Sequence, residues 1–249
     1  MGKELINIIG YGFVGQANGL GLKRLGYEVK AYDIIKKKNI YKDKDFNKIP
    51  LEIKEKPKEG INIICIAEKN GRKQDINHIK KAISELKGTV IVRTTILPRL
   101  VKEVNMDFYW VEFLKERTAV LDFLNPELTV VGRRNKREFP IKEFKPYYCS
   151  PEEASHIKYL SNIWNALRIA FVNEFGDNLE GENINKKNVL DSFFKGEKYL
   201  KWGNAYGGHC LPKDSLAYSK QYPHLSIIKS FIQANEKHRK KYPYLKSIY

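Results

Sequence analysis

Three glycines at a fixed spacing follow the first apolar segment of the chain, and they restrict its fold more than any other feature. The motif Gly10-Tyr11-Gly12-Phe13-Val14-Gly15 stands between the apolar run 5–9 and a helical pattern over residues 13–25. Between a strand and a helix, G-x-G-x-x-G is the phosphate-binding turn of a dinucleotide fold. The first glycine permits the tight turn, the second lets a pyrophosphate approach the backbone, and the third lets helix and strand pack closely.

An acidic residue follows at the position that dinucleotide folds use to bind ribose. Asp33 lies at the end of a second predicted strand, residues 28–34, and its carboxylate can accept hydrogen bonds from the ribose hydroxyls. This favours NAD over NADP, although the adjacent Lys36–Lys38 could accommodate a 2′-phosphate. The cofactor-binding residues predicted from this part of the chain are Gly10, Gly12, Phe13, Val14, Gly15 and Asp33.

Strand patterns continue through the first 150 residues and alternate with helical ones. After residues 36–60, which we expect to be an exposed crossover with little secondary structure, an apolar strand pattern covers 61–67 and a helical pattern covers 74–86. This alternation predicts an α/β fold with a Rossmann-type, doubly wound, mostly parallel sheet. The remaining predicted strands are 89–94, 108–111 and 128–131.

The pattern changes near Ser150, which suits the N-cap of a long helix beginning at Pro151. No strand pattern returns, so we expect an NAD-binding domain over residues 1–150 and an all-helical domain over 151–249. The long central helix carries an apolar stripe at helical spacing. Its members are Ile157, Leu160, Trp164, Leu167, Phe171 and Phe175, and shorter helices are predicted over 187–194, 213–220 and 226–240.

Charge and cysteine content limit the partners. With 45 Lys and Arg against 29 Asp and Glu, the net charge of +16 could attract nucleic acid, an acidic membrane surface or a phosphorylated small molecule. The basic residues are spread along the chain without an aromatic–basic RNA-binding signature, which disfavours nucleic acid. No apolar stretch reaches membrane-spanning length and no secretion signal is visible. Three cysteines without metal-type spacing predict no metal site and a reducing, cytoplasmic location.

A cysteine at a predicted helix start is the first candidate for covalent chemistry. Cys210 follows Gly207 and Gly208, and Asp214 lies one helical turn after it. A helix N-terminus lowers the pKa of a thiol and favours the nucleophilic thiolate. The alternative is a buried, inert cysteine near a turn.

Two further pairs of polar residues are each spaced four apart. Lys158 and Asn162 flank the stripe on the long helix, where they could stabilise an oxyanion and orient a water molecule. Glu112 and Glu116 follow the strand at 108–111, at the edge where open α/β sheets bind ligands. Thr95 lies just beyond the preceding strand, at the same edge. Taken singly, each pair is equally consistent with ordinary surface residues.

Taken together, these motifs resemble the UDP-glucose/GDP-mannose dehydrogenase family over nearly the whole chain. Residues 111–132, VEFLKERTAVLDFLNPELTVVG, are similar to the family's PEFLREGxAxxDxxxPxRxVxG block. Residues 154–174 resemble its central-helix block with K-x-x-x-N, residues 207–214 its G-G-x-C-x-x-K-D motif, and residues 93–95 its K-S-T segment.

The resemblance implies two NAD-dependent oxidations that convert the C6 alcohol of a UDP-glucose-like or GDP-mannose-like sugar to a carboxylate through a thioester on Cys210. Lys158 and Asn162 would stabilise the oxyanion, while Asp214, Glu112 and Thr95 would manage water and protons. The helix at 152–180 would form a homodimer. Further cofactor contacts would come from Thr95, Glu116 and Lys213, and substrate contacts from Glu112, Phe113, Lys158, Asn162, Gly207 and Gly208.

Chains of this family continue into a second α/β domain that binds the nucleotide, whereas this sequence ends at Tyr249. We therefore expect a short form, to which a separate chain could supply the missing domain. Two other functions stay open: an NAD-binding relative with little or no dehydrogenase activity, and a basic binding module on a Rossmann scaffold. The presence together of Thr95, Glu112, Lys158, Asn162, Cys210 and Asp214 favours the enzyme, and the missing domain favours the inactive relative.

Overall fold

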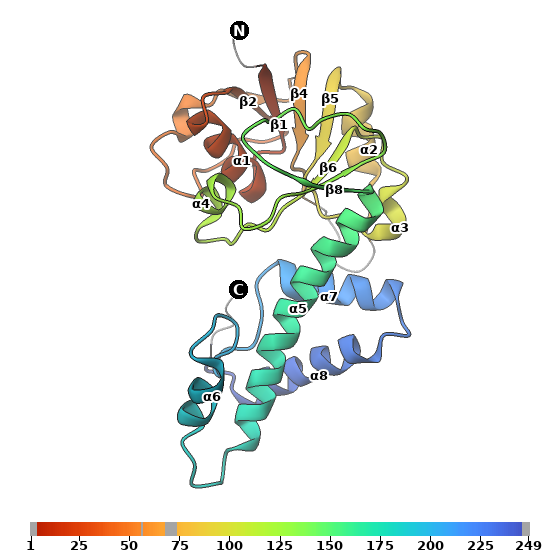
Figure 1. The fold of residues 1–249 in the computed structure, drawn as a ribbon. Helices are drawn as coiled ribbons and strands as arrows, with labels where there is room; N and C mark the ends of the chain where they lie inside the picture. Colours follow the sequence, from red (N-terminus) through yellow and green to blue (C-terminus); the bar gives the residue numbers. More distant parts are fainter. Residues whose placement is uncertain (1–3, 56, 68–73, 246–249) are drawn as a thin grey trace. The chain divides into compact units, whose positions relative to one another are not determined.

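A computed structural model describes residues 4–55, 57–67 and 74–245 (Figure 1). The chain divides into two compact units between Lys158 and Tyr159, inside the long helix α5, Pro151–Asn178. Among the described residues no helix is both long enough and apolar enough to cross a membrane.

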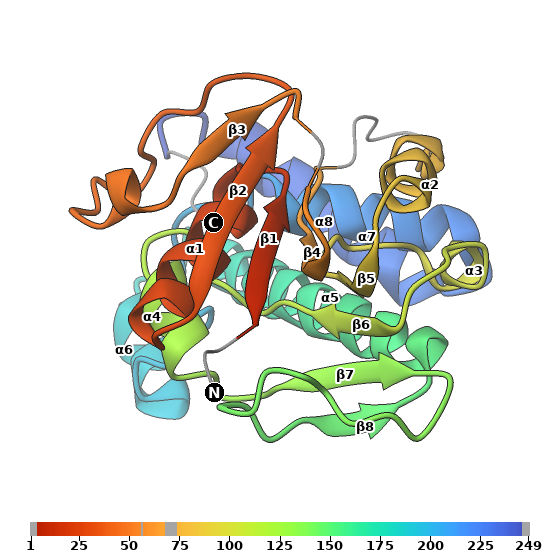
Figure 2. The ribbon, with the colours of Figure 1, turned by 90° about the horizontal axis from the view of Figure 1, so that it is seen from above.

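The first unit is built on one eight-stranded sheet, whose order is β3-β2-β1-β4-β5-β6-β7-β8 (Figure 2). Neighbouring strands are parallel except β6 and β7, which are antiparallel. Strand order reverses between β1 and β4, and such a switch point is where this class of sheet binds dinucleotides. The strands are β1 Leu5–Ile9, β2 Glu28–Asp33, β3 Leu51–Ile53, β4 Gly60–Ile64, β5 Gly88–Val92, β6 Phe108–Val111, β7 Val130–Arg133 and β8 Tyr147–Cys149.

Helices cover both faces of this sheet. Successive side chains of each strand point to opposite faces, and the apolar ones form two cores that the helices cover. On β6, Phe108 and Trp110 enter one core, together with residues of α1, Phe13–Arg24, and α4, Ala119–Leu124. Tyr109 and Val111 enter the other core, with residues of α2 and α3. The predicted fold, a doubly wound and mostly parallel Rossmann-type sheet, is therefore confirmed. Helices α2 and α3 span Asn77–Ser84 and Pro98–Val101.

The expectation for residues 36–60 is wrong in one respect. This segment contains a short 3-10 turn, η1, at Phe46–Lys48, and the edge strand β3, which pairs with β2. Two hydrogen bonds also hold this segment against the start of α1. Gln16 Nε2 donates to the Lys38 carbonyl at 2.9 Å, and the Tyr41 hydroxyl donates to the Phe13 carbonyl at 3.0 Å. A strand of three residues has no periodicity to detect, so sequence patterns miss it.

The second unit is helical. Helix α5 begins with a capping box, because the Ser150 hydroxyl accepts from the Glu153 N–H at 3.2 Å and the Glu153 carboxylate accepts from the Ser150 N–H at 2.8 Å. Its core joins α5 residues such as Ala166 and Ile169 to Leu211 and Phe231 of later helices. Those later helices are α6 Lys186–Phe194, α7 Cys210–Gln221 and α8 Ser226–Lys241.

Candidate active site

The glycine turn has the geometry that a pyrophosphate requires. Gly10 has a φ of +90°, and a Cβ there would lie 2.9 Å from the backbone of Cys65 and Ile66. A Cβ on Gly15 would lie 2.0 Å from the Gly10 carbonyl oxygen, so the third glycine permits the close packing of turn and helix. A Cβ on Gly12 would meet no atom within 4 Å. The open space beside Gly12, at the N-terminus of α1, fits a bound phosphate group.

Asp33 lies beside this turn at the end of β2. One of its carboxylate oxygens accepts a hydrogen bond from the Tyr11 N–H at 2.7 Å, and the other lies 3.3 Å from the Lys37 ammonium. The side chain is 7% exposed, which leaves the carboxylate fixed in position at the rim of the dinucleotide turn. Its placement fits the predicted contact with ribose hydroxyls.

Glu112 and Lys158 form a buried ion pair in the first unit. Glu112 follows β6, and its carboxylate lies 3.0 Å from the Lys158 ammonium, with 7% and 5% of the two side chains exposed. The Leu114 N–H donates to the same carboxylate at 2.8 Å. Burial alone would raise the pKa of Glu112, but the Lys158 charge and these hydrogen bonds hold the pKa below its usual value. The Phe113 ring lies 5.5 Å from the Lys158 ammonium.

Sequence reasoning missed Arg93, a second buried cation close to Glu112. Its guanidinium stacks 3.8 Å from the centre of the Trp110 ring and donates to the carbonyls of Trp110 and Val111, each at 3.4 Å. Burial lowers the pKa of Arg93 to about 10. The positive charge of Arg93 also helps to lower the pKa of Glu112. Its place at the end of β5, in the segment that resembles K-S-T, is the signal that could have identified it.

Two other predicted residues of the first unit are less confined. Thr95 is half-buried, and its backbone carbonyl accepts a hydrogen bond from Gln74 Nε2 at 2.9 Å. Glu116 is exposed. The roles predicted for Thr95 and Glu116 therefore remain predictions.

In the second unit, Cys210 is the first residue of α7, and it is exposed. Asp214, one turn later, is 1% exposed, and one of its carboxylate oxygens accepts a hydrogen bond from Asn162 Nδ2 at 2.6 Å. The Lys213 ammonium lies 3.4 Å from the other oxygen of Asp214. The structure thus joins two predicted residues, Asn162 of α5 and Asp214 of α7, and the second lies one turn after the cysteine.

The glycines before Cys210 shape the approach to it. Gly207 is buried, whereas Gly208 is exposed and has a φ of +68°, a conformation that glycine adopts without strain. Across the described part of the chain, no group of three or more His, Cys, Asp or Glu residues is placed to hold a metal ion.

The fold and the glycine turn define the class: a Rossmann-type protein with a dinucleotide-binding turn and a helical second unit. Residues 152–238 match the central domain of the UDP-glucose/GDP-mannose dehydrogenase family. It is 29% identical over 224 residues to the GDP-mannose 6-dehydrogenase of Pseudomonas aeruginosa, covering 74% of this chain and 50% of that protein. With the UDP-glucose 6-dehydrogenase of Campylobacter jejuni it shares 27% identity, covering 67% of this chain and 47% of that protein.

A solved structure supports the fold. A UDP-glucose dehydrogenase from the archaeon Pyrobaculum islandicum superposes with a TM-score of 0.82 at 21% identity, covering 94% of this chain and 68% of that one. The chain spans about half the length of the curated relatives it matches.

Proposed function

We propose that this protein oxidises the C6 alcohol of a nucleotide sugar of the UDP-glucose or GDP-mannose type to a carboxylate. Bound NAD supplies the hydride acceptor, and the glycine turn with Asp33 would hold it. The overall change converts the alcohol and one water to a carboxylate, with two hydrides transferred and three protons released. Because the reaction requires a reduced cysteine, the proposal also assigns the protein to the cytoplasm, where thiols are kept reduced.

Each predicted catalytic residue has a proposed role in this reaction. Cys210 would add to the C6 aldehyde through its thiolate, and loss of a hydride from the adduct would leave a thioester. Lys158 and Asn162 would donate hydrogen bonds to the oxyanion. Asp214 would direct the water whose addition releases the carboxylate and regenerates the thiol.

Glu112 would act together with Thr95 in proton transfer from the alcohol. The lowered pKa of Glu112 keeps this side chain a carboxylate at neutral pH, which is the state that a general base needs. Phe113, Gly207 and Gly208 would contact the substrate, and Glu116 and Lys213 the cofactor.

One observation carries the proposal: four of the predicted polar residues are buried and joined in pairs. A surface lysine or asparagine would normally be solvated, yet Lys158 and Asn162 are 4% and 6% exposed. Each is bonded to another predicted residue, Glu112 and Asp214 respectively. A structural scaffold has no need of these buried charges, which are costly to desolvate.

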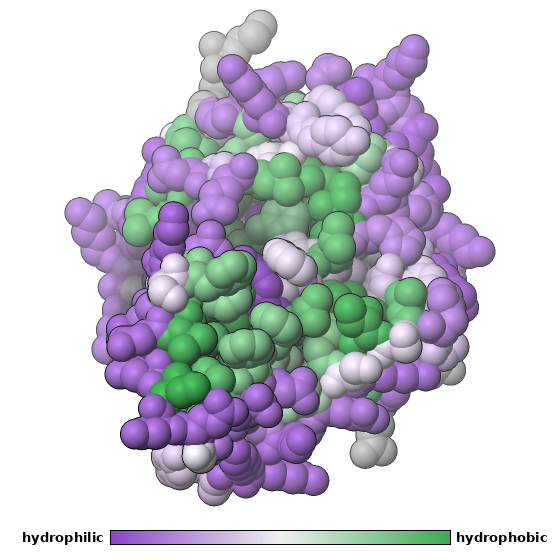
Figure 3. All heavy atoms as spheres, turned by 60° about the horizontal axis from the view of Figure 1, so that its bottom comes forward, coloured by the Kyte–Doolittle hydropathy of each residue, from purple (hydrophilic) through white to green (hydrophobic). Residues whose placement is uncertain are grey.

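We also propose a homodimer formed through α5, within the predicted segment 152–180. Figure 3 shows apolar side chains gathered on one face of the molecule. On α5, Trp164 and Phe171 are each 53% exposed, and Phe171 lines a hollow of about 510 Å³ with Ile227 and Phe231 of α8. Exposed apolar surface of this kind marks an interaction site.

The direct test follows NADH absorbance while the purified protein is incubated with NAD and a panel of UDP- and GDP-sugars. A yield of two NADH per sugar, lost in Cys210→Ser, supports the full oxidation. One NADH per sugar would contradict the thioester step. Binding of NAD without turnover of any sugar would favour the inactive-relative alternative.

A further inference from the structure

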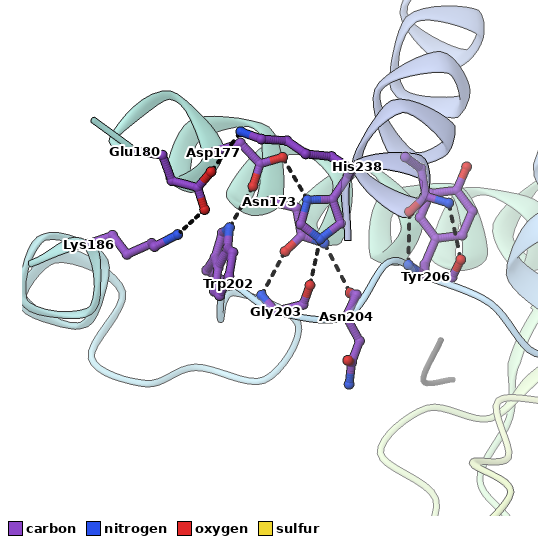
Figure 4. A network of polar contacts seen from close by, with 11 residues as sticks. Asn173, Asp177, Glu180, Lys186, Trp202, Gly203, Asn204, Tyr206 and His238 are labelled. Carbon is purple, nitrogen blue, oxygen red and sulfur yellow. Dashed lines mark hydrogen bonds and ion pairs between the residues drawn. The ribbon is translucent and has the colours of Figure 1, made fainter. Parts of the chain in front are cut away.

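The segment that leads to Cys210 is tied to two helices by buried polar side chains (Figure 4). From α5, Asn173 accepts the Gly203 N–H at 2.9 Å and donates to the Asn204 carbonyl at 3.0 Å. From α8, Asn235 accepts the Tyr206 N–H at 2.9 Å and donates to the Tyr206 carbonyl at 3.1 Å. These contacts fix residues 203–206, immediately before the glycines and the cysteine.

At the centre of these contacts lies His238, which is 2% exposed and has no role in the proposed reaction. Its Nδ1 lies 2.7 Å from Asp177 Oδ2, and its Nε2 lies 2.6 Å from the Gly203 carbonyl oxygen. Trp202 Nε1 donates to the other oxygen of Asp177 at 2.7 Å. Both ring nitrogens of His238 therefore face oxygens that can only accept, since Asp177 is a carboxylate and a carbonyl carries no proton.

A neutral imidazole has one N–H, so one of its nitrogens would point a lone pair at an oxygen. Both contacts become hydrogen bonds only when the ring carries two protons, and charge-assisted bonds of this kind are the stronger ones. Asp177 supplies the balancing negative charge.

The other charged groups around the ring are paired among themselves. Glu180 is bound by Lys186 and Lys241, each at 2.8 Å. Tyr242 packs with its ring centre 4.9 Å from that of His238. Arg239 donates to the Tyr206 carbonyl at 3.0 Å and pairs with Glu236 at 3.1 Å.

We propose that His238, held as an imidazolium between Asp177 and the Gly203 carbonyl, is a positioning residue for the segment that presents Cys210 at the start of α7. The importance of this for catalysis rests on the proposed function of Cys210. Fixing Gly203 limits the motion of the residues that follow and keeps the first turn of α7 formed beneath the thiol. The dipole of that turn favours the thiolate.

Nitrogen NMR of the His238 ring in the wild-type protein tests the protonation state at pH 7. Two protonated nitrogens are expected, and a neutral tautomer would overturn the inference. The exposed His209 and His224 provide internal reference signals.

Three variants of the full chain test the positioning role. His238→Phe keeps an aromatic ring and removes both donors, whereas His238→Gln keeps one donor that can reach the Gly203 carbonyl. Ile228→Ala is the matched control, because Ile228 is 3% exposed on the same helix and packs in the apolar core. Circular dichroism establishes that each variant is folded.

Hydrogen–deuterium exchange of the peptide covering 202–209 should rise about tenfold or more in His238→Phe, as expected for the loss of two charge-assisted bonds. Alkylation of Cys210 at pH 7 should slow by about two- to fivefold, the size of a helix-dipole effect. His238→Gln should restore much of the wild-type exchange rate and of the wild-type alkylation rate. Ile228→Ala should change neither the exchange of this peptide nor the alkylation of Cys210. Wild-type exchange and alkylation in His238→Phe would overturn the inference. Neither measurement needs turnover of a substrate. If both give the expected results but the protein oxidises no sugar nucleotide, the positioning role of His238 stands and only the proposed function is refuted.

Discussion

Glu112 and Lys158 lie almost out of contact with water, so the charge on each depends on the other. Removing one charge of such a pair leaves its partner buried and uncompensated, which typically costs about 3–5 kcal/mol. We expect Glu112→Gln to lower the free energy of unfolding at pH 7 by an amount near the lower end of that range, because glutamine still accepts hydrogen bonds. Urea unfolding measures it.

The sign of the pH dependence follows from the lowered pKa of Glu112 in the folded protein. A carboxyl group with a lowered folded pKa contributes stability above its unfolded pKa, about 4.3, and loses it as pH falls through the folded value. The difference between wild type and Glu112→Gln should therefore be constant from pH 6 to 8 and shrink below about pH 4. A difference that grows on acidification would show that Glu112 is not held as a carboxylate.

Cys210 differs from the other two cysteines in its surroundings. Burial raises the pKa of Cys65 to about 12 and that of Cys149 to about 11, whereas Cys210 is exposed at a helix N-terminus. Asp214, whose negative charge opposes a thiolate, is engaged by Asn162 and lies 3.4 Å from the Lys213 ammonium. These contacts weaken the effect of the Asp214 charge on Cys210.

Iodoacetamide labelling at pH 7, resolved by residue in mass spectrometry, should modify Cys210 more than about a hundredfold faster than Cys65, since thiolate population falls tenfold per unit of pKa. Cys210 should also react faster than glutathione, and NAD or a sugar nucleotide should protect it. Labelling no faster than an ordinary thiol, or no protection, would remove the nucleophile from the proposed function.

Among the elements, α5 carries the prediction about assembly. Its aromatic side chains Trp164, Phe171 and Phe175 are between 46% and 53% exposed, which fits a surface that a second copy covers. We expect light scattering to give a dimer at micromolar concentration and Phe171→Glu to give a monomer. Phe193→Glu is the matched control, because Phe193 is 79% exposed on α6, outside the proposed interface. A wild-type monomer would contradict the proposal.

Elements marked by an apolar run or by a helix-capping signal were predictable, and elements without such a signal were not. β1 and β6 begin and end where the apolar runs predict them, and α5 begins at Pro151 as the N-cap signal at Ser150 indicates. β8, Tyr147–Cys149, was not predicted because its three residues are too few to show an alternation of apolar and polar side chains. Helices α3 and α4, of four and six residues, are held by packing rather than by their own periodicity.

The candidate site shows the same division. Motif spacing predicted Glu112, Lys158, Asn162 and Asp214 as site residues, but it did not predict which of these side chains would contact one another. The ion pair of Glu112 with Lys158 and the hydrogen bond of Asn162 with Asp214 are tertiary contacts, between residues 46 and 52 positions apart in the chain. His238 was missed because a single basic residue in a sequence gives no sign that it will be buried. For Arg93, the only such signal was its place in the segment that resembles K-S-T.

For the molecule as a whole, the net charge of +16 is consistent with an anionic ligand such as a nucleotide sugar. Exposed charge acts over about 8 Å at physiological ionic strength, so it speeds association more than it selects a partner. In the proposed function, the glycine turn and the buried pairs would select the ligand.

Cofactor binding should appear as a change in the stability of the folded chain. A ligand that binds only the folded state adds about 2.7 kcal/mol at a concentration of 100 Kd, so saturating NAD should raise Tm by several degrees. NADP at the same concentration should raise Tm less, because Asp33 repels a 2′-phosphate.

Gly12 and Gly15 give a matched pair of variants that separates binding from folding. A Cβ at Gly12 meets nothing within 4 Å, so Gly12→Val should fold with nearly the wild-type Tm but place its side chain where the pyrophosphate must lie. A Cβ at Gly15 would lie 2.0 Å from the Gly10 carbonyl oxygen, so Gly15→Val should lower Tm even without ligand. If Gly12→Val retains the full NAD shift in a thermal melt, NAD binds elsewhere and the dinucleotide site is refuted. If wild type shows no shift, the Rossmann-type unit is serving only as a scaffold.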